Sequence, residues 1–268
     1  MALPIGDVNP TRRRSFVMGT FVLLNLAVFV YQTFVLSGCE QVAFVYRFAV
    51  IPAEITGADP LHPGDAAAIL GDCAQPDKSV ALSLLTTMFL HGGVAHLLGN
   101  LLYLAVFGDN VEDRLGHLRF ILFYVVGGGV ATVTYIVLQP TATTPLVGAS
   151  GAIAAVLGAY LVCYPRAKVL ALVPFPLYLL TFLLPGVRMR RWLIVVAVIS
   201  LPAWLLLIGW FAVQALAVFD PVGALVAYEA HVAGFLAGIV LLLVLDAGRS
   251  RRGREPFHAA RGRGQPRG

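Results

Sequence analysis

Long apolar runs separated by short polar stretches constrain this chain more than any other feature. A helix needs about 20 apolar residues to cross the hydrocarbon core of a bilayer. Of the 268 residues, 59% are apolar and 12% are charged, whereas soluble domains are about 45–50% apolar and about 25% charged. These proportions argue against a water-soluble enzyme, a disordered protein and a nucleic-acid module. The clear runs lie at 16–36, 119–138, 147–164, 192–216 and 224–245.

Two further apolar stretches, at 81–108 and 169–185, are less regular. The first is interrupted by His91-Gly92-Gly93, and such a glycine pair favours a break between two helical pieces. We therefore expect residues 81–91 to lie in or near the outer interface and an inward helix to run from Val94 to about Phe107. The second stretch contains three prolines, which interrupt helices. We expect an interfacial or re-entrant insertion on the cytoplasmic side there, with a seventh span as the alternative.

The placement of basic residues predicts the orientation of the chain. With six spans and both termini inside, 17 of the 19 Lys and Arg residues fall on the cytoplasmic side, and only Arg47 and Lys78 fall outside. This asymmetry is what the positive-inside rule expects. A seventh span at 169–185 would strand Arg188, Arg190 and Arg191 outside. The one long loop, 37–80, is then expected on the outer side.

These features together predict an all-α, polytopic protein of the cell membrane: a six-helix bundle with a long outer loop between its first two helices. The membrane domain is expected at 16–246, between a basic cytoplasmic tail at 1–15 and a basic, disordered cytoplasmic tail at 247–268. Basic residues beside a bilayer attract anionic lipids. The lipid bilayer is therefore the expected partner of the C-terminal tail, and no nucleic-acid partner is expected.

A serine stands at the outer start of the run at 147–164, in the sequence Gly148-Ala149-Ser150-Gly151. A lone serine in a membrane helix is often a packing residue that bonds back to its own backbone. The flanking glycines favour another interpretation, since they let a second backbone approach closely. They also leave the N–H groups around Ser150 accessible at a helix N-terminus, where an oxyanion can be stabilised.

A histidine stands near the start of the last run. Ala230, Gly234 and Gly238 recur every four residues and form a stripe of small residues, which favours close helix packing, and His231 lies beside that stripe. The alternative is a structural histidine bonded to a backbone carbonyl. As an imidazole with a pKa near neutral, His231 is a candidate general base.

The irregular stretch at 81–108 carries His91, His96 and Asn100. His96 and Asn100 are four residues apart and share one helical face. These side chains could stabilise an oxyanion. Alternatively, they could form hydrogen bonds between helices or supply half of a metal site. No H-E-x-x-H motif occurs and no acidic residue lies in the inner part of these helices, so no metal is expected.

Ser150, His231 and Asn100 are all expected within about 10 Å of the outer surface, at about 1.5 Å per residue. A nucleophile, a base and an amide donor at one depth suggest an acyl-transfer site. A triad also needs an acid that orients the histidine. Asp220 falls in an outer loop and Glu229 points to the other side of its helix, so a Ser–His dyad is predicted.

On these motifs the chain resembles the rhomboid family of intramembrane serine proteases. The resemblance covers about residues 40–55 and 80–245. The matching segments are Gly148-Ala149-Ser150-Gly151, Ala230-His231 with Gly234 and Gly238, His91-Gly92-Gly93-Val94-Ala95-His96-Leu97-Leu98-Gly99-Asn100, and Phe107-Gly108-Asp109-Asn110-Val111-Glu112-Asp113 followed by Gly116 and Arg119-Phe120.

The resemblance implies a six-helix core that cleaves transmembrane segments of single-span or polytopic membrane proteins near the outer surface, without metal or cofactor. Ser150 would be the nucleophile, His231 the base, and His96 and Asn100 would stabilise the oxyanion with the backbone N–H of Ser150. His91 would support the loop. Many members carry an aromatic ring four positions after the serine, where this chain has Ala154. A catalytically silent relative that binds or chaperones membrane clients is the alternative.

The three cysteines are too few for a disulfide scaffold, but two of them, Cys39 and Cys73, fall in the outer loop. Disulfides persist in such an environment, so a Cys39–Cys73 bridge is expected. The competing possibility is lipidation of Cys39, because Leu36-Ser37-Gly38-Cys39 resembles a bacterial lipoprotein processing box. The preceding apolar run of about 20 residues is longer than the 7–15 typical of a signal sequence.

Overall fold

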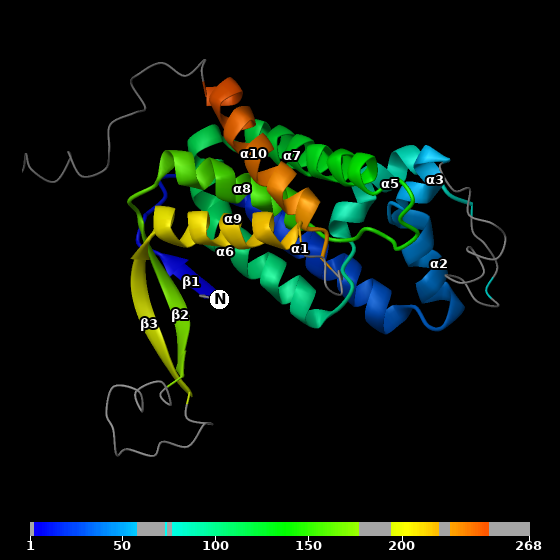
Figure 1. The fold of residues 1–268 in the computed structure, drawn as a ribbon, viewed down its shortest axis with the longest axis horizontal. Helices are drawn as coiled ribbons and strands as arrows, with labels where there is room; N and C mark the ends of the chain where they lie inside the picture. Colours follow the sequence, from blue (N-terminus) through cyan, green and yellow to red (C-terminus); the bar gives the residue numbers. More distant parts are fainter. Residues whose placement is uncertain (1–2, 58–72, 74–76, 177–193, 220–225, 247–268) are drawn as a thin grey trace, which may run out of the picture.

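The helices of the protein pack side by side, and a small antiparallel sheet lies at one end of the bundle (Figure 1). The computed structural model describes residues 3–57, 73, 77–176, 194–219 and 226–246. The elements, in chain order, are β1 (Leu3–Asp7), α1 (Phe16–Val30), η1 (Tyr31–Val35), α2 (Cys39–Phe48), α3 (Pro52–Thr56), α5 (Val80–Thr86), η2 (Thr87–Phe89), α6 (Val94–Leu115), α7 (His117–Leu138), α8 (Ser150–Cys163), β2 (Lys168–Pro176), β3 (Ile194–Pro202), α9 (Ala203–Ala217) and α10 (Tyr228–Asp246).

Four segments in the described part of the chain are long and apolar enough to cross a bilayer: Phe16–Val35, α6, α7 and α10. This confirms the prediction of a mostly helical, polytopic membrane protein. The other two predicted spans correspond to α8 and α9, which have 14 and 15 residues. At about 1.5 Å per residue, α8 is about 21 Å long, less than the hydrocarbon thickness of about 30 Å. The count of six spans stays a prediction.

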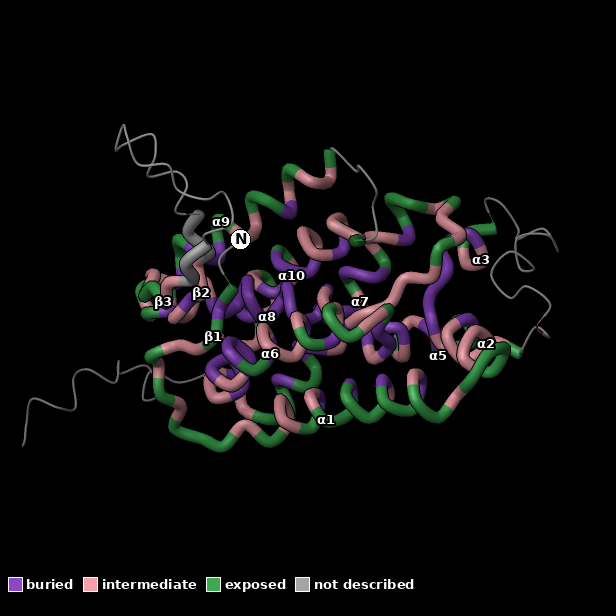
Figure 2. The backbone as a smooth tube through the Cα atoms, turned by 90° about the horizontal axis from the view of Figure 1, so that it is seen from below, coloured by how far each residue is buried: buried purple, intermediate pink, exposed green. Residues whose placement is uncertain are grey.

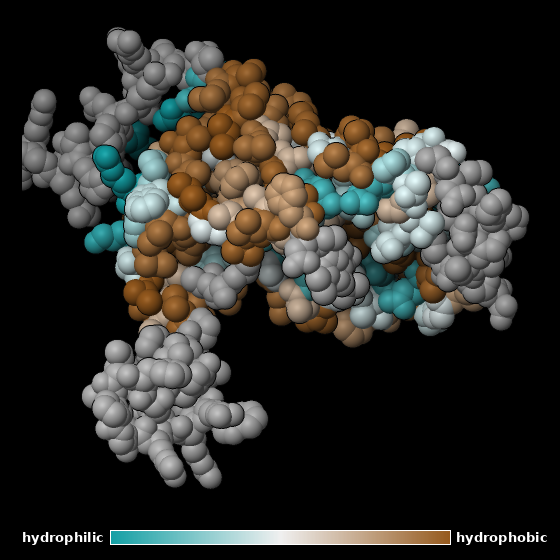
Figure 3. All heavy atoms as spheres, in the orientation of Figure 1, coloured by the Kyte–Doolittle hydropathy of each residue, from teal (hydrophilic) through white to brown (hydrophobic). Residues whose placement is uncertain are grey.

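Helix α8 lies in the interior of the bundle, where every residue from Gly151 to Tyr160 is buried (Figure 2). It packs against α6, α7 and α10. The outer faces of α1, α7 and α10 expose large apolar side chains, among them Leu23, Val137 and Val244, and apolar residues cover much of the surface in Figure 3. Water disfavours so large an apolar surface, but a bilayer accommodates it.

Helices α8 and α10 make a close contact at the centre of the fold. A Cβ atom added at Gly238 would lie 2.0 Å from the carbonyl oxygen of Ala155, and one added at Gly158 would lie 2.1 Å from that of Phe235. No side chain fits at either position, so the two backbones touch. Small residues serve this purpose in membrane helices because they let dispersion contacts form along both backbones.

The sheet corrects two expectations. Within the stretch 192–216, predicted as one span, residues 194–202 form β3, so the helix α9 begins only at Ala203. Residues 168–176, in the predicted re-entrant insertion, form β2, which pairs antiparallel with β3 from Lys168 opposite Pro202 to Pro176 opposite Ile194. Residues 177–193 lie outside the described residues. The β-branched residues of 194–199 favour a strand, and an apolar run alone does not distinguish a strand from a helix.

The N-terminal segment, predicted as a basic tail, contributes β1, which pairs antiparallel with β2 from Leu3 opposite Leu172 to Asp7 opposite Val169. The all-α description therefore needs this three-stranded sheet added to it. The predicted C-terminal tail at 247–268 lies outside the described residues.

Helix α6 continues to Leu115, beyond the end expected near Phe107. The reason is that the N-terminal segment satisfies its buried polar residues. The carboxylate of Glu112, which is only 1% exposed, accepts the backbone N–H groups of Val17 and Met18 at 3.0 and 2.7 Å. The N–H groups in the first turn of a helix have no intrahelical partners, and Glu112 supplies acceptors for two of them in α1. The buried carboxylate is thereby satisfied, so α6 can continue past it.

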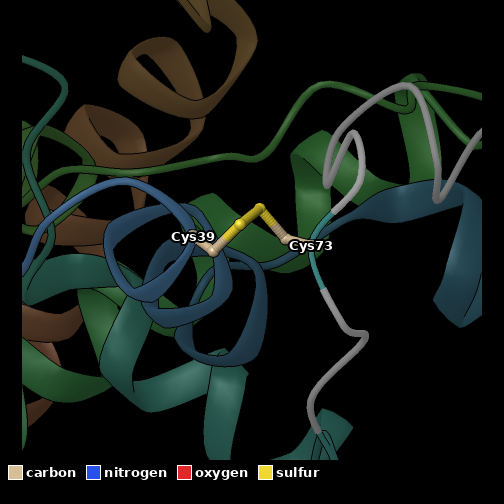
Figure 4. Close-up of a disulfide and its surroundings, with 2 residues drawn as sticks. All are labelled: Cys39 and Cys73. Atoms are coloured by element: carbon tan, nitrogen blue, oxygen red, sulfur yellow. A yellow bond between two sulfur atoms is a disulfide. The ribbon is translucent and has the colours of Figure 1, made fainter.

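The predicted outer loop contains the short helices α2 and α3. Cys39, the first residue of α2, forms a disulfide with Cys73 (Figure 4), and their Cα atoms are 5.2 Å apart. The structure thus contains the bridge that the sequence analysis expected. A sulfur atom in a disulfide cannot carry a thioether-linked lipid, so the structure argues against the lipidated form of Cys39.

Candidate active site

The loop before α8 is held in a conformation that only glycine adopts easily. Gly148 has a φ of +123°, and its N–H donates to the carbonyl of Thr87 at 3.0 Å. A Cβ atom there would lie 2.7 Å from the ring of His96 and 3.6 Å from the amide nitrogen of Asn100. Both the positive φ and the lack of room for a Cβ atom therefore require glycine here. Its small size lets the loop lie directly against those two side chains.

Thr87, in η2, fixes this loop further. Its hydroxyl donates to the carbonyl of Leu146 and accepts the N–H of Val50 at 3.3 Å, while Leu146 N–H donates to the Val50 carbonyl at 2.7 Å. These bonds join three segments that are far apart in the sequence. They hold the approach to Ser150 in one position.

Ser150 is the first residue of α8 and is half-buried. The first N–H groups of a helix have no intrahelical acceptor and carry the positive end of the helix dipole. The first backbone bond of this turn runs from the N–H of Ile153 to the carbonyl of Ala149, at 2.9 Å. Among the described residues, the N–H groups of Ser150 and Gly151 have no backbone acceptor, so they can act as donors at this end of the helix.

Ser150 and His231 both lie near the N-terminal ends of their helices, α8 and α10, where these two helices are in contact. A Cβ atom added at Gly234 would lie 2.2 Å from the carbonyl oxygen of Gly151, and one added at Gly151 would lie 3.9 Å from that of Ala230. Gly151, the residue after Ser150, thus contacts Gly234, which lies three residues after His231 on α10. Within the described residues no hydrogen bond joins the two side chains themselves.

The His231 ring, half-buried, is surrounded by side chains of α9 and α10. Its Nδ1 lies 2.7 Å from Oε1 of Gln214. The Trp210 ring is 6.0 Å away at an interplanar angle of 32°, and the Tyr228 ring is 6.4 Å away, edge-on. The sequence analysis missed Gln214 and Trp210. The available signal was Gln214 itself, the one amide in the apolar sequence of α9, since strongly polar residues in membrane helices indicate function.

His91, His96 and Asn100 form one cluster beside Gly148. Nδ2 of Asn100 lies 2.9 Å from Nε2 of His91, and the rings of His91 and His96 are 5.1 Å apart. His91 is only 1% exposed, and its backbone carbonyl accepts the side-chain amide of Gln32 at 3.2 Å. His91 thus contacts Asn100 from behind, whereas His96 and Asn100 face the loop that leads to Ser150.

Two further observations bear on the predicted chemistry. Glu229 accepts the side-chain amide of Gln139 at 2.8 Å, so its carboxylate is directed toward the end of α7 rather than His231. Asp220 lies outside the described residues. No three His, Cys, Asp or Glu side chains in the ranges described above lie together so that they could hold a metal ion.

The fold therefore defines a multi-span helical membrane protein in which a serine at the N-terminus of one helix and a histidine of another lie near a close contact of these two helices. The chain belongs to the rhomboid family: the model of the Rhomboid domain matches residues 78–247. This range contains α6 to α10 and all the candidate site residues named above.

Similar proteins carry the same family name. The chain is 44% identical over 78 residues to the Rhomboid protease GluP of Bacillus subtilis, covering 29% of this chain and 15% of that protein. It is 37% identical over 79 residues to the mitochondrial RHOMBOID-like protein 6 of Arabidopsis thaliana, covering 29% and 25%. It is 31% identical over 159 residues to RHOMBOID-like protein 2 of the same plant, covering 53% and 48%. The matched segments thus span less than half of each of these relatives.

Proposed function

We propose that this protein is an intramembrane serine endopeptidase that cleaves transmembrane segments of other membrane proteins near the outer membrane surface. Ser150 is the proposed nucleophile and His231 the proposed general base. The observation that carries the proposal is the backbone contact of Gly234 with Gly151, because Ser150 is adjacent to Gly151 and His231 is within one helical turn of Gly234. A hydroxyl and an imidazole on two touching helices are the parts of an activated nucleophile.

In the proposed reaction, His231 takes the proton of the Ser150 hydroxyl while Oγ attacks the carbonyl carbon of the substrate peptide bond. The backbone N–H of Ser150, with the side chains of His96 and Asn100, stabilises the charge that develops on the carbonyl oxygen. The imidazolium then protonates the leaving amine, and an acyl-enzyme remains. Water entering from the outer side hydrolyses that ester, with His231 again as the base.

The accessibility of the site supports this proposal. Ser150 and His231 are both half-buried rather than enclosed, so an unwound substrate segment has access to them. Residues that weaken a helix, such as Gly and Pro, are therefore expected near the cleavage site. The substrates are proposed to be single-span or polytopic membrane proteins.

The proposed orientation places this site and the loop at 37–80 on the outer side of the cell membrane, with both termini in the cytoplasm. The Cys39–Cys73 disulfide supports that orientation, because disulfides persist in oxidising compartments and are rare in the cytosol.

A cleavage assay on the full chain in lipid vesicles tests the function. Purified protein is incubated with a panel of single-span substrates, alongside Ser150→Ala and His231→Ala. We expect cleavage by the parent chain and a loss of at least about 10³-fold in each variant, as for the removal of a nucleophile or its base. Binding of clients that neither substitution changes, with no product from any chain, would instead support a catalytically silent rhomboid-like protein that binds or chaperones membrane proteins.

A further inference from the structure

One feature of the candidate site is not accounted for by Ser150, His231 and the oxyanion donors: the polar contact that α9 makes with the histidine. Gln214 is 5% exposed and is the one amide in a helix whose other residues are apolar or glycine. Burying an amide without a hydrogen-bond partner is unfavourable in proteins. The partner found here is Nδ1 of His231, at 2.7 Å.

The direction of this hydrogen bond follows from the chemistry of its two atoms. An amide oxygen only accepts, so the bond requires a proton on Nδ1 of His231. A neutral imidazole with its proton on Nδ1 has an unprotonated Nε2. That tautomer is the one in which Nε2 can receive a proton from a serine hydroxyl.

Other elements around His231 do not supply this contact. The nearby carboxylate on α10, Glu229, is paired with Gln139. On α8, the residue four positions after Ser150 is Ala154, whose methyl group has neither an acceptor nor a ring. Among the described residues, the hydrogen bond to the His231 ring therefore comes from α9.

Trp210, a second side chain of α9, also lies beside the His231 ring. Trp210 and Gln214 are four residues apart and hence on one helical face, and the Trp210 ring lies 6.0 Å from the His231 ring. Phe211, from the next position along α9, packs on Phe235 of α10 with ring centroids 4.7 Å apart. These aromatic contacts hold α9 against α10 at the level of the histidine.

We propose that Gln214 is a positioning residue for the dyad: its amide oxygen accepts the Nδ1–H of His231 and thereby fixes both the tautomer and the plane of the imidazole. Trp210 flanks the ring and limits its rotation. The inference rests on the proposed function. It assigns to a neutral amide the orienting role that a carboxylate has in a Ser–His–Asp triad, without the negative charge that would stabilise the imidazolium.

The test combines a kinetic measurement with a spectroscopic one on the full chain in lipid vesicles. Gln214→Met keeps the length of the side chain and removes the amide oxygen. We expect kcat for a cleaved single-span substrate to fall about 10–100-fold, with KM within about twofold. Gln214→Glu keeps an acceptor oxygen and is expected to retain at least about a third of the parent kcat. Leu216→Met, on the exposed face of α9, is the matched control and is expected to match the parent chain.

The spectroscopic measurement uses ¹⁵N-labelled histidine, with the His231 signals identified among the six histidines by their loss in His231→Gln. In the parent chain we expect a protonated Nδ1 and an unprotonated Nε2, and in Gln214→Met a rise of the tautomer protonated on Nε2. A parent spectrum with the proton on Nε2 would overturn the proposal, whether or not any variant folds. An unchanged kcat in folded Gln214→Met would also overturn it.

Failure of this inference is distinguishable from failure of the proposed function. If the parent chain cleaves no substrate, the endopeptidase is wrong, yet the spectrum still tests the hydrogen bond. If the parent chain cleaves and Gln214→Met cleaves equally well, the endopeptidase stands and the positioning role is wrong.

Discussion

The two ends of α8 are held in place by different means. At its start, where Ser150 lies, the chain is fixed by close backbone approach and by main-chain hydrogen bonds through Thr87. At its other end, the Tyr160 hydroxyl donates to the Asp7 carboxylate at 2.5 Å. Nδ2 of Asn110 donates to the same carboxylate at 3.0 Å, and Asn9 donates to Asn110 at 2.7 Å.

This difference separates the proposed reactive end of α8 from its structural end. At the sheet end, the side chains of Asp7, Tyr160, Asn110 and Asn9 hydrogen-bond to one another. At the Ser150 end, backbone contacts and the Thr87 hydroxyl hold the chain, and the side chains of Ser150 and His96 remain available. A rigid support that does not occupy the reactive groups is what a preorganised site requires. We therefore expect substitutions near Ser150 to lower activity more than stability. Substitutions at the sheet end are expected to lower stability more than activity.

The largest effect is expected at the helix contact itself. Gly238→Ala places a Cβ atom 2.0 Å from the carbonyl oxygen of Ala155, so α10 must move away from α8 and carry His231 with it. We expect kcat/KM to fall at least about 100-fold and the free energy of unfolding to fall by about 1–3 kcal/mol. Gly209→Ala on α9, where a Cβ atom meets no neighbour within 4 Å, is the control. Unchanged cleavage by Gly238→Ala would contradict the role of the contact.

A smaller effect is expected from the loop before Ser150. Thr87→Val removes the hydroxyl that bonds both Leu146 and Val50. Because the loop then loses one of its ties to η2, we expect kcat to fall about tenfold, in line with about 1–1.5 kcal/mol for a lost hydrogen bond. Thr134→Val serves as the matched variant, since Thr134 is half-buried and, within the described residues, its hydroxyl bonds to its own helix at Val130. Equal kcat values for the two variants would show that this loop does not control the position of Ser150.

The smallest effect on activity is expected at the sheet end. Tyr160→Phe removes the hydrogen bond to Asp7, and we expect kcat to stay within about twofold while the free energy of unfolding falls by about 1 kcal/mol. Burial raises the pKa of Asp7, and the Tyr160 hydrogen bond opposes that rise. The bond favours the ionised carboxylate, so the loss of stability should be greater at pH 8 than at pH 4. Thermal unfolding at both pH values measures this, and a greater loss at pH 4 would contradict it.

Much of this arrangement could be predicted from the sequence because it depends on patterns that a bilayer imposes. The apolar runs predicted α1, α7, α8 and α10 to within a few residues. The stripe of Gly234 and Gly238 predicted the close packing around His231, since small residues at that spacing have few other uses in a membrane helix. The i, i+4 spacing of His96 and Asn100 predicted that they share a helical face, and the structure places both side chains against Gly148.

Other features could not be predicted because they depend on contacts between distant segments. The strands β2 and β3 lie in stretches as apolar as a span, and pairing with each other decides their conformation. Helix α6 continues past Asn110 and Glu112 because residues of the N-terminal segment bond to both side chains. Gln214 was visible as a lone amide, but its partner was not, since a sequence does not reveal which face of α9 meets α10.

The most direct test of the central claim is the labelling of the full chain in lipid vesicles with a fluorophosphonate, a reagent that modifies a serine only when a base activates its hydroxyl. The protein is then digested and the modified residue identified by mass spectrometry. The account predicts modification at Ser150 that is lost in His231→Ala and retained in Tyr160→Phe. Modification at another serine, or labelling of Ser150 that persists without His231, would contradict it.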